Sequence, residues 1–350
     1  MAPGWDLLAC PACGGELVRG PACLGCGRTY AEEAGLVRLR ASAGAMIEGR
    51  IEAVRTFYEH APFPGYPPNS SLAWLRARGD RSPFARRLDQ AIAGDARIVE
   101  VGCGTGQMSL YLARADRVVV AADLTLTSLR LGAGAARRFG IDQVRFVETD
   151  LHRPGLRKGA FDVVVCSGVL HHTPDPRRAF ARIVELARPG GMIVVGLYNA
   201  VARIPLRLRR AVARLSGYRW IPFDPVLRER DAEPARREAW LRDQYMHPEE
   251  HRHTHGEVLR WFAENHVDYV RAFPSALIDD PSEDLFAPCG DAWAPEAWLA
   301  QLGWMASLGH EGGLFVMVGQ RAAAPPAAAP VLVKPAACSA PALLREEEVG

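Results

Sequence analysis

Arg97-Ile98-Val99-Glu100-Val101-Gly102-Cys103-Gly104-Thr105-Gly106 is the stretch that decides the fold of this 350-residue chain. Its first half is rich in apolar residues, which predicts a short buried strand with Glu100 at its carboxyl end. The glycines that follow permit a sharp turn and a close approach of the backbone to a ligand. The apolar periodicity resumes after Gln107, which predicts a helix whose positive end points at the turn. This order predicts a nucleotide-type site at the edge of an α/β sheet.

The spacing of the glycines distinguishes between two classes of nucleotide site. A dinucleotide fingerprint, Gly-x-Gly-x-x-Gly, needs its third glycine at position 107, where the chain has Gln107. The pattern from Glu100 to Gly106, Glu-x-Gly-x-Gly-x-Gly, instead resembles the first motif of the class I S-adenosylmethionine-dependent methyltransferases. Glycine-rich turns between strands and helices are common, so the assignment depends on further motifs along the chain.

Strands and helices alternate from residue 97 to about residue 197, which predicts a parallel sheet with helices on both faces. The predicted strands are 97–101, 117–122, 144–149, 161–167 and 191–197, and the predicted helices lie near 107–115, 125–139 and 176–188. Two more strands are expected at 269–272 and 314–319, the last of them antiparallel by resemblance to the family. The expected fold class is α/β: a Rossmann-like methyltransferase sheet of seven mostly parallel strands, preceded by a small N-terminal zinc ribbon.

Four later motifs stand in the order and spacing of the same family, so that the resemblance covers residues 95–200. The second strand ends at Asp123, the third at Asp150, and the fourth at Ser167. A Pro-Gly-Gly turn at 189–191 precedes the fifth strand. Taken singly, such acids are also frequent helix caps and such turns are common. Together they indicate a site for S-adenosylmethionine.

The resemblance assigns roles to residues of this site. An acid at Asp123 can accept hydrogen bonds from both ribose hydroxyls, and Asp150 is expected to accept from the adenine amino group. Glu100 would meet the methionine ammonium group. The expected cofactor-binding residues are Glu100, Gly102, Cys103, Gly104, Gly106, Asp123, Leu124, Asp150, Leu151, Cys166 and Ser167.

Methyl transfer requires alignment of acceptor, methyl group and sulfur, and a base only where the acceptor must lose a proton. His171 and His172 follow the fourth strand, and histidine titrates near neutrality, so either is a candidate base. A histidine at this place can equally serve only to shape the site. Tyr198 and Asn199, at the end of the fifth strand, are candidates for orienting the acceptor.

Four cysteines near the N-terminus, Cys10, Cys13, Cys23 and Cys26, form two Cys-x-x-Cys pairs that are each followed by glycine. Two such pairs can surround a tetrahedral zinc ion. The less favoured alternatives are two disulfides, which are rare in cytoplasmic chains, and a thioredoxin-like redox pair, which needs only one Cys-x-x-Cys beside a βαβ unit. A unit of this size cannot build a sufficient core, so a structural zinc would supply its folding energy. The segment resembles the zinc ribbon of some methyltransferases, including bacterial rRNA guanine methyltransferases.

The sequence divides into six expected segments. They are a zinc ribbon at 1–40, a helical or lid segment at 46–94, the cofactor-binding core at 95–200, a helical substrate-side insertion at 201–266, the last strands with a helical insertion at 267–321, and a disordered Ala/Pro-rich tail at 322–350. The histidine-dense stretch 243–255 can be a polar wall of the acceptor pocket or a solvated loop. Metal binding by His251, His253 and His255 is a third, less favoured interpretation.

Composition limits the partners. The net charge is only +2, which argues against an extended nucleic-acid surface. No apolar run is long enough to cross a bilayer and no leader peptide precedes the ribbon, so we expect a cytoplasmic protein with no membrane partner. The expected function is methyl transfer to a small-molecule acceptor. The alternatives are an RNA methyltransferase that uses the ribbon to bind RNA and a non-catalytic binding protein, and the oligomeric state is not predicted.

Overall fold

The computed structural model describes residues 4–40, 45–59, 62, 64–224, 226–228, 234–247, 249–277, 280, 282–290, 294–308 and 312–323. The tail predicted at 322–350 lies outside these residues from position 324 onward. Phe63, in the predicted helical or lid segment 46–94, and Trp293, in the predicted segment 267–321, also lie outside them. Among the described residues, no helix has the length and apolar character that crossing a membrane would require.

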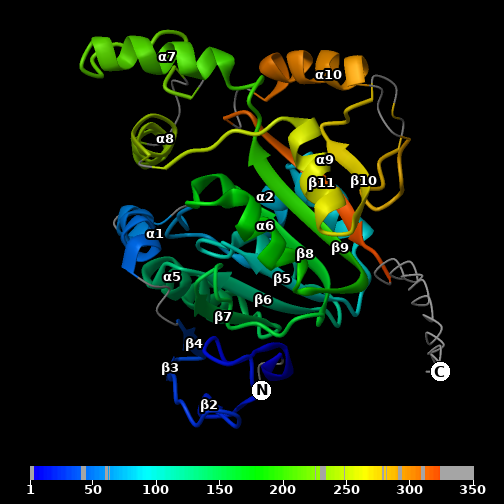
Figure 1. Ribbon diagram of the computed structural model, residues 1–350. Helices are drawn as coiled ribbons and strands as arrows, with labels where there is room; N and C mark the ends of the chain where they lie inside the picture. Colours follow the sequence, from blue (N-terminus) through cyan, green and yellow to red (C-terminus); the bar gives the residue numbers. More distant parts are fainter. Residues whose placement is uncertain are drawn as a thin grey trace, which may run out of the picture.

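A nine-stranded sheet forms the centre of the molecule, in the order β10-β11-β9-β8-β5-β6-β7-β4-β3 (Figure 1). Its strands are β3 Ala31–Glu33, β4 Leu36–Leu39, β5 Arg97–Val101, β6 Val118–Asp123, β7 Val144–Thr149, β8 Phe161–Ser167, β9 Ala187–Tyr198, β10 Val267–Phe273 and β11 Leu314–Arg321. Neighbouring strands from β4 to β9 run parallel, whereas β11 runs antiparallel to both β9 and β10. The seven predicted strands are therefore all present, and the antiparallel last strand is confirmed.

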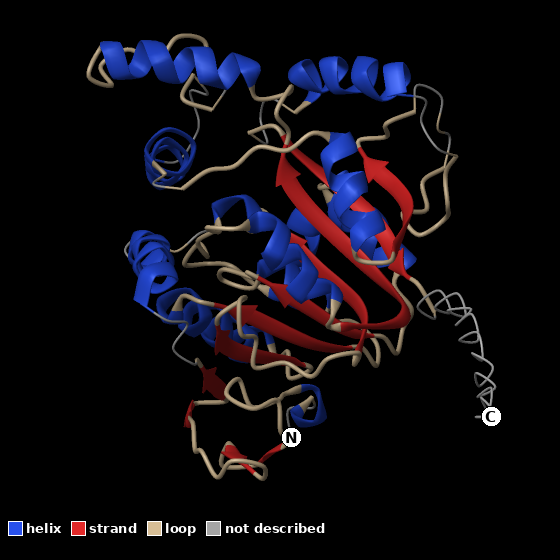
Figure 2. Cartoon of the chain, viewed as in Figure 1, coloured by secondary structure: helices blue, strands red, loops and turns tan. Residues whose placement is uncertain are grey.

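Helices cover both faces of the sheet (Figure 2). They are α1 Ala45–Glu59, α2 Leu72–Asp80, α3 Pro83–Ala91, α4 Gln107–Leu112, α5 Leu126–Phe139, α6 Pro176–Val184, α7 Ile204–Leu215, α8 Pro234–Met246, α9 His255–Glu264 and α10 Ala294–Ser307, with a short 3-10 helix η2 at Leu170–His172. Side chains alternate along a strand, so Ile98 of β5 packs in one apolar layer with α2–α5 and Val99 packs in the other with α6 and α9. The two layers are the core.

The N-terminal segment extends this sheet, which the prediction of a separate unit at 1–40 did not include. Strand β4 pairs in parallel with β7, with Val37 opposite Val147. The segment also carries a 3-10 helix at Trp5–Leu7 and two short strands, β1 Leu17–Val18 and β2 Ala22–Cys23. Leu7 and Leu8 are buried in the same apolar layer as Val99. A ribbon this small has no core of its own, so its apolar side chains pack on the large domain.

Candidate functional site

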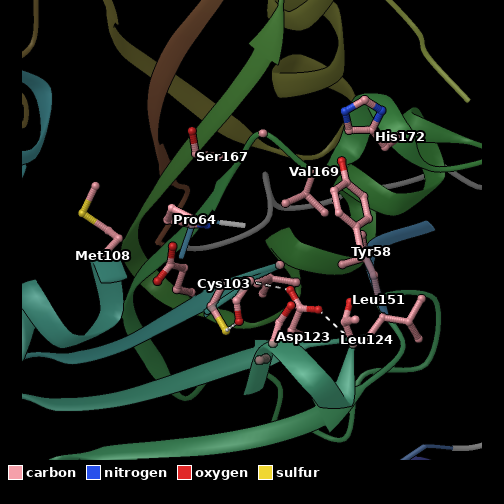
Figure 3. A pocket seen from close by; sticks show the side chains of 18 of the residues that line it. Tyr58, Pro64, Cys103, Met108, Asp123, Leu124, Leu151, Ser167, Val169 and His172 are labelled. Carbon is pink, nitrogen blue, oxygen red and sulfur yellow. Dashed lines mark hydrogen bonds between the residues drawn. The ribbon is translucent and has the colours of Figure 1, made fainter. Parts of the chain in front are cut away.

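A cavity of about 670 Å³ lies at the carboxyl ends of the parallel strands. Because these ends meet at one edge of the sheet, residues far apart in sequence come together there. The predicted site residues that line the cavity are Glu100, Gly102, Cys103, Gly104, Asp123, Leu124, Asp150, Leu151, Ser167, His172 and Tyr198. In Figure 3, Asp123 and Leu124 lie at one side of the cavity, and Tyr58 and His172 lie across from them.

The glycine turn is tightly packed against its neighbours. Gly102 has a φ of +74°, and a Cβ there would lie 2.2 Å from a methyl carbon of Val169. Gly106 also has a φ of +74° and caps the start of α4, and a Cβ there would lie 2.8 Å from the ring of Phe146. Only glycine therefore fits these two positions. Gly106 is not among the lining residues of the cavity, so its part in the structure is to begin the helix.

Asp123 joins the turn to the neighbouring strand. Its Oδ2 accepts a hydrogen bond from the backbone N–H of Gly104 at 2.8 Å, and its Oδ1 accepts from that of Thr125 at 2.8 Å. Burial raises the pKa of Asp123 above its usual range, although these N–H groups act in the opposite direction. Each carboxylate oxygen can accept a further hydrogen bond, so Asp123 keeps capacity for a ligand in the cavity.

Two further acids face the same cavity. Glu100 is buried, and desolvation raises its pKa to about 7, although it accepts a short hydrogen bond from the hydroxyl of Ser109. Asp150 accepts from the backbone N–H of His152 at 2.8 Å through Oδ1. The three strand ends thus present three carboxyl groups, all hydrogen-bond acceptors when ionised, to one cavity.

The two adjacent histidines occupy different environments. His172 lines the cavity, and its Nδ1 lies 2.8 Å from the carbonyl oxygen of Glu249. Because a carbonyl only accepts, Nδ1 carries the proton in the neutral ring and Nε2 is the basic nitrogen. His171 is fully buried and does not line the cavity. Its ring stacks on Tyr198 with centroids 3.7 Å apart, and burial lowers its pKa well below the usual range.

Cys166 is the other predicted cofactor-binding residue that does not line the cavity. It is fully buried in the apolar layer beneath α6. Successive side chains of a strand point to opposite faces, so a strand that places Ser167 at the cavity turns Cys166 into the core.

Helices α1 and α8 supply a wall that the sequence located only in outline. Phe57 and Tyr58 of α1 line the cavity, as an aromatic lid in 46–94 would require. Gln244 of α8 donates from Nε2 to the hydroxyl oxygen of Tyr198 at 2.8 Å. Trp240 and Arg242, also of α8, line the cavity and were not singled out for it from the sequence. The sequence indicated only that both residues belong to the insertion 201–266, where folds of this kind carry acceptor-binding elements.

The histidine-dense stretch 243–255 separates into two parts. His247 lies beside the cavity residue His172, with ring centroids 3.7 Å apart. His253 instead bonds Glu257 at 2.9 Å, and His255 packs against the ring of Tyr269. The metal-binding interpretation of His251, His253 and His255 has no support in the described part of the chain, where only the N-terminal cysteines form a convergent ligand group.

The four N-terminal cysteines converge as the sequence predicts. Their Sγ atoms all lie within 4.8 Å of one another. The Cys10–Cys26 pair is separated by 3.7 Å and the Cys13–Cys23 pair by 3.5 Å. Four thiolates at about 2.3 Å from a tetrahedral zinc ion would stand about 3.8 Å apart, so the cluster fits that geometry. The hydroxyl of Tyr30 lies 3.0 Å from Cys10 Sγ and can orient it.

Comparison with known proteins agrees with this site. Residues 99–195 match the methyltransferase domain family. The chain is 29% identical over 248 residues to an uncharacterised protein of Synechococcus, but the match covers 62% of this chain and only 58% of that relative. It is 30% identical over 183 residues to a ubiquinone biosynthesis O-methyltransferase of Xanthomonas oryzae, covering 49% of this chain and 74% of the relative.

Among solved structures, a 1,6-didemethyltoxoflavin-N1-methyltransferase of Burkholderia thailandensis is similar over 85% of this chain and 97% of its own, with 16% identity and a TM-score of 0.46. The family match spans residues 99–195, which include the glycine turn and strands β6 to β8. The chain belongs to the class I S-adenosylmethionine-dependent methyltransferases.

Proposed function

We propose that this protein transfers a methyl group from S-adenosylmethionine to a small-molecule acceptor. The observation that carries the proposal is one cavity with two distinct walls. The strand ends supply Glu100, Asp123 and Asp150, and the facing wall of aromatic and polar side chains comes from α1, η2 and α8. A cofactor bound to the first wall and an acceptor bound to the second would face each other across this cavity.

The residues of the first wall fit the cofactor. Glu100 would hold its ammonium group, Asp123 its ribose hydroxyls and Asp150 its adenine amino group, while the turn at Gly102 leaves room for the methionine portion. When bound, S-adenosylmethionine supplies an electrophilic methyl group on a sulfonium that leaves as a neutral thioether. The protein therefore needs no acid for the leaving group, and its own contribution is alignment and exclusion of water.

The second wall supports a small acceptor more than RNA. None of the described ribbon residues 4–40 lines the cavity, so the ribbon is no part of the acceptor wall. Helices α1 and α8 instead narrow the cavity over the strand ends, with Tyr58 and Trp240 among its lining residues. The Xanthomonas relative, by its name, methylates an oxygen in ubiquinone biosynthesis. An acceptor with a flat apolar body would suit these aromatic side chains.

We assign the base to His172. Its Nδ1 is turned toward Glu249, so its Nε2 can take the proton of an acceptor hydroxyl or amide. Tyr198 accepts from Gln244, so its own hydroxyl proton is directed to another acceptor and can orient the methyl-receiving group. His171 packs behind Tyr198 and acts as a positioning residue.

We further propose that Cys10, Cys13, Cys23 and Cys26 hold one structural zinc ion. The support is the convergence of four sulfur atoms in a segment with little core of its own. Four protein ligands leave no open coordination position, which is the arrangement of structural rather than catalytic zinc sites.

Calorimetric titration with S-adenosylmethionine, S-adenosylhomocysteine and NAD tests the function. We expect binding of the two sulfur nucleotides and none of NAD. Replacing Asp123 by Ala should weaken that binding by about 1–3 kcal/mol, because the ribose loses an acceptor. Asp268→Ala, at an exposed position of β10, is the matched control and should leave affinity unchanged. Absence of binding by the wild-type protein would overturn the proposal, and labelled-methyl transfer to candidate acceptors would follow a positive result.

A further inference from the structure

Helix α7 exposes an apolar face that the methyl-transfer site does not explain. Ile204 is 41% exposed, Leu208 is 67% exposed and Leu215 is 90% exposed. On the other side of the helix, Leu206 and Ala213 are buried. The sequence predicts a helical insertion at 201–266, but it does not show which side chains of that insertion face the interior.

The exposed apolar side chains form one stripe. At about 100° per residue, Ile204, Leu208 and Leu215 fall within an arc of roughly 40°, and Leu206 and Ala213 lie on the opposite side. Helix α7 therefore has two apolar sides. One side packs on the interior, and the other faces solvent. An apolar stripe on the outer surface has no role in packing the domain, so it indicates a partner.

Exposed aromatic side chains follow the helix in the sequence. Trp220 is 62% exposed and Phe223 is 71% exposed. Phe223 is held at a φ of +53°, which side-chain-bearing residues rarely adopt. We define the α7 face as Ile204, Leu208, Leu215, Trp220 and Phe223. Large apolar groups so strongly exposed and so close in sequence are uncommon on a free surface.

A second helix exposes similar groups at the same end of the molecule, where α7 and α10 run along one side (Figure 1). In α10, Trp298 is 53% exposed and Leu299 is 58% exposed. Asn199, which precedes α7 in the sequence, donates to Gln301 of α10 at 3.0 Å and accepts from the backbone N–H of Val201. Both α7 and α10 therefore expose apolar side chains at this end of the molecule.

The charged residues of the segment that carries the α7 face are all of one sign. Residues 201–223 contain six arginines and no aspartate or glutamate. Arg203 and Arg210 turn inward to Glu250. The other four, Arg207, Arg209, Arg214 and Arg219, form no ion pair with any described residue. A partner that is complementary to this face would therefore offer negative charge to the arginines and an apolar region to the exposed leucines.

We propose that the α7 face docks on an anionic lipid bilayer surface. A surface helix with an apolar stripe, flanking arginines and exposed tryptophan can lie in the plane of the headgroups. RNA would use the arginines but leave Leu208 and Leu215 in water, whereas a bilayer takes up both kinds of group. The expectation of no membrane partner rested on the lack of a spanning segment, and surface docking needs none.

Flotation of the full-length protein with lipid vesicles tests the docking. We expect the protein to float with phosphatidylcholine–phosphatidylglycerol vesicles and not with phosphatidylcholine alone, and added salt should weaken the binding. The Leu208→Glu variant should reduce the bound fraction roughly tenfold or more, because a charge replaces an apolar contact beside anionic headgroups. Leu24→Glu is the matched control, since Leu24 in the ribbon is also 67% exposed.

Four results would overturn the proposal. They are no binding to the anionic vesicles, equal binding to both kinds of vesicle, equal loss in the Leu208 and Leu24 variants, and a dimer in solution that Leu208→Glu separates. The last result would make the face a contact between two copies of the chain. Circular dichroism melting checks that both variants fold, and Arg214→Glu, which should also release the protein from anionic vesicles, provides a second independent variant.

Discussion

His171 and His172 are equivalent candidates in the sequence and differ completely in the structure. The ring of His171 contacts Tyr198, and neither of its nitrogens has a hydrogen-bond partner within the described part of the chain. The ring of His172 faces the cavity and is oriented by Glu249. The ring of His171 therefore serves for packing, whereas the ring of His172 is placed where it can take part in proton transfer.

Replacing each histidine by phenylalanine separates these roles. His171→Phe keeps a flat ring against Tyr198 and should retain methyl transfer within a few-fold. His172→Phe removes the base and should lower the rate by roughly 10²–10⁴-fold. The measurement is single-turnover transfer of labelled methyl to the acceptor found by screening, with S-adenosylhomocysteine affinity as the control for folding. Equal loss in the two variants would contradict the assignment of His172.

Glu100 predicts a pH dependence of stability. Burial raises its pKa from the ordinary 4.5 to about 7. Below pH 4.5 the group is protonated in both the folded and the unfolded chain. As the pH rises from there to 7, the unfolded chain releases this proton and the folded chain keeps it, so the free energy of unfolding falls, by about 3 kcal/mol in all.

The variant Glu100→Gln does not titrate at this position. Its free energy of unfolding, relative to that of the wild type, should therefore rise between pH 5 and pH 8. Denaturant unfolding of the ligand-free proteins at several pH values measures the difference. A difference that stays constant over this range would show that the buried carboxyl group does not have a raised pKa.

At the scale of single elements, α5 carries a matched pair of glycines. A Cβ on Gly132 would lie 2.5 Å from the carbonyl oxygen of Thr105 and 2.6 Å from the ring of Phe146. A Cβ on Gly134 would meet nothing within 4 Å. Gly132 thus allows α5 to approach the glycine turn of the cofactor site, and Gly134 has no such role.

The same substitution should therefore have opposite effects at these two positions. Gly132→Ala should lower the free energy of unfolding by about 1–3 kcal/mol through overpacking. Gly134→Ala should raise it by about 0.5–1 kcal/mol, because alanine is the better helix former. Denaturant unfolding measures both. A shift of the same sign in the two variants would mean that the contact of α5 with the turn is looser than described.

The ribbon makes a prediction of its own. Metal analysis of the purified protein should find about one zinc per chain, and the double variant Cys10→Ser/Cys13→Ser should lose it, because two ligands cannot hold the ion. The melting temperature should fall as well, since the ribbon and β4 are continuous with the edge of the sheet. Cys289→Ser, outside the cluster, is the control and should keep its zinc. Undiminished zinc in the double variant would refute the site.

At the scale of the whole molecule, one buried ion pair joins the beginning of the inserted segment 201–266 to a residue near its end. The side chain of Arg203, at the start of α7, is only 1% exposed and lies 3.0 Å from Glu250, which is 8% exposed. Arg203 also donates to Gln244 at 2.9 Å, and its guanidinium lies 3.6 Å from the centroid of the Tyr198 ring. Burial alone would raise the pKa of Glu250, but Arg203 and Arg210 hold it below its usual value.

Removing this carboxylate should have a large effect. Glu250→Gln leaves Arg203 buried without its counter-charge and should cost about 3–5 kcal/mol of stability. The exposed pair Arg177–Glu264 provides the control, and Glu264→Gln should change stability by less than about 1 kcal/mol. Thermal and denaturant unfolding compare the two. If Glu250→Gln lost as little stability as Glu264→Gln, the Arg203–Glu250 pair would have to be accessible to water.

The strands of the sheet and the position of most proposed cofactor-binding residues at its edge could be predicted because both depend on local pattern. Alternating strands and helices of ordinary length admit few arrangements, and acids at the ends of parallel strands must meet at one edge. The turn at Gly102 and the acids Glu100, Asp123 and Asp150 follow from this rule. The convergence of the four cysteines was predictable for a similar reason, since their spacing permits little else.

What depended on tertiary contacts was the direction of single side chains and the faces of the inserted helices. Only packing turns Cys166 into the core, places His171 behind Tyr198 and brings Gln244 to the cavity. It also buries Leu206 while leaving Leu208 in solvent, and it attaches β4 to β7. These outcomes rest on contacts between segments as far apart in sequence as Val37 and Val147, and the free energies of such contacts are not encoded in local periodicity. Local pattern therefore determined the framework and its nucleotide edge, and long-range packing decided the acceptor wall and the outer surface.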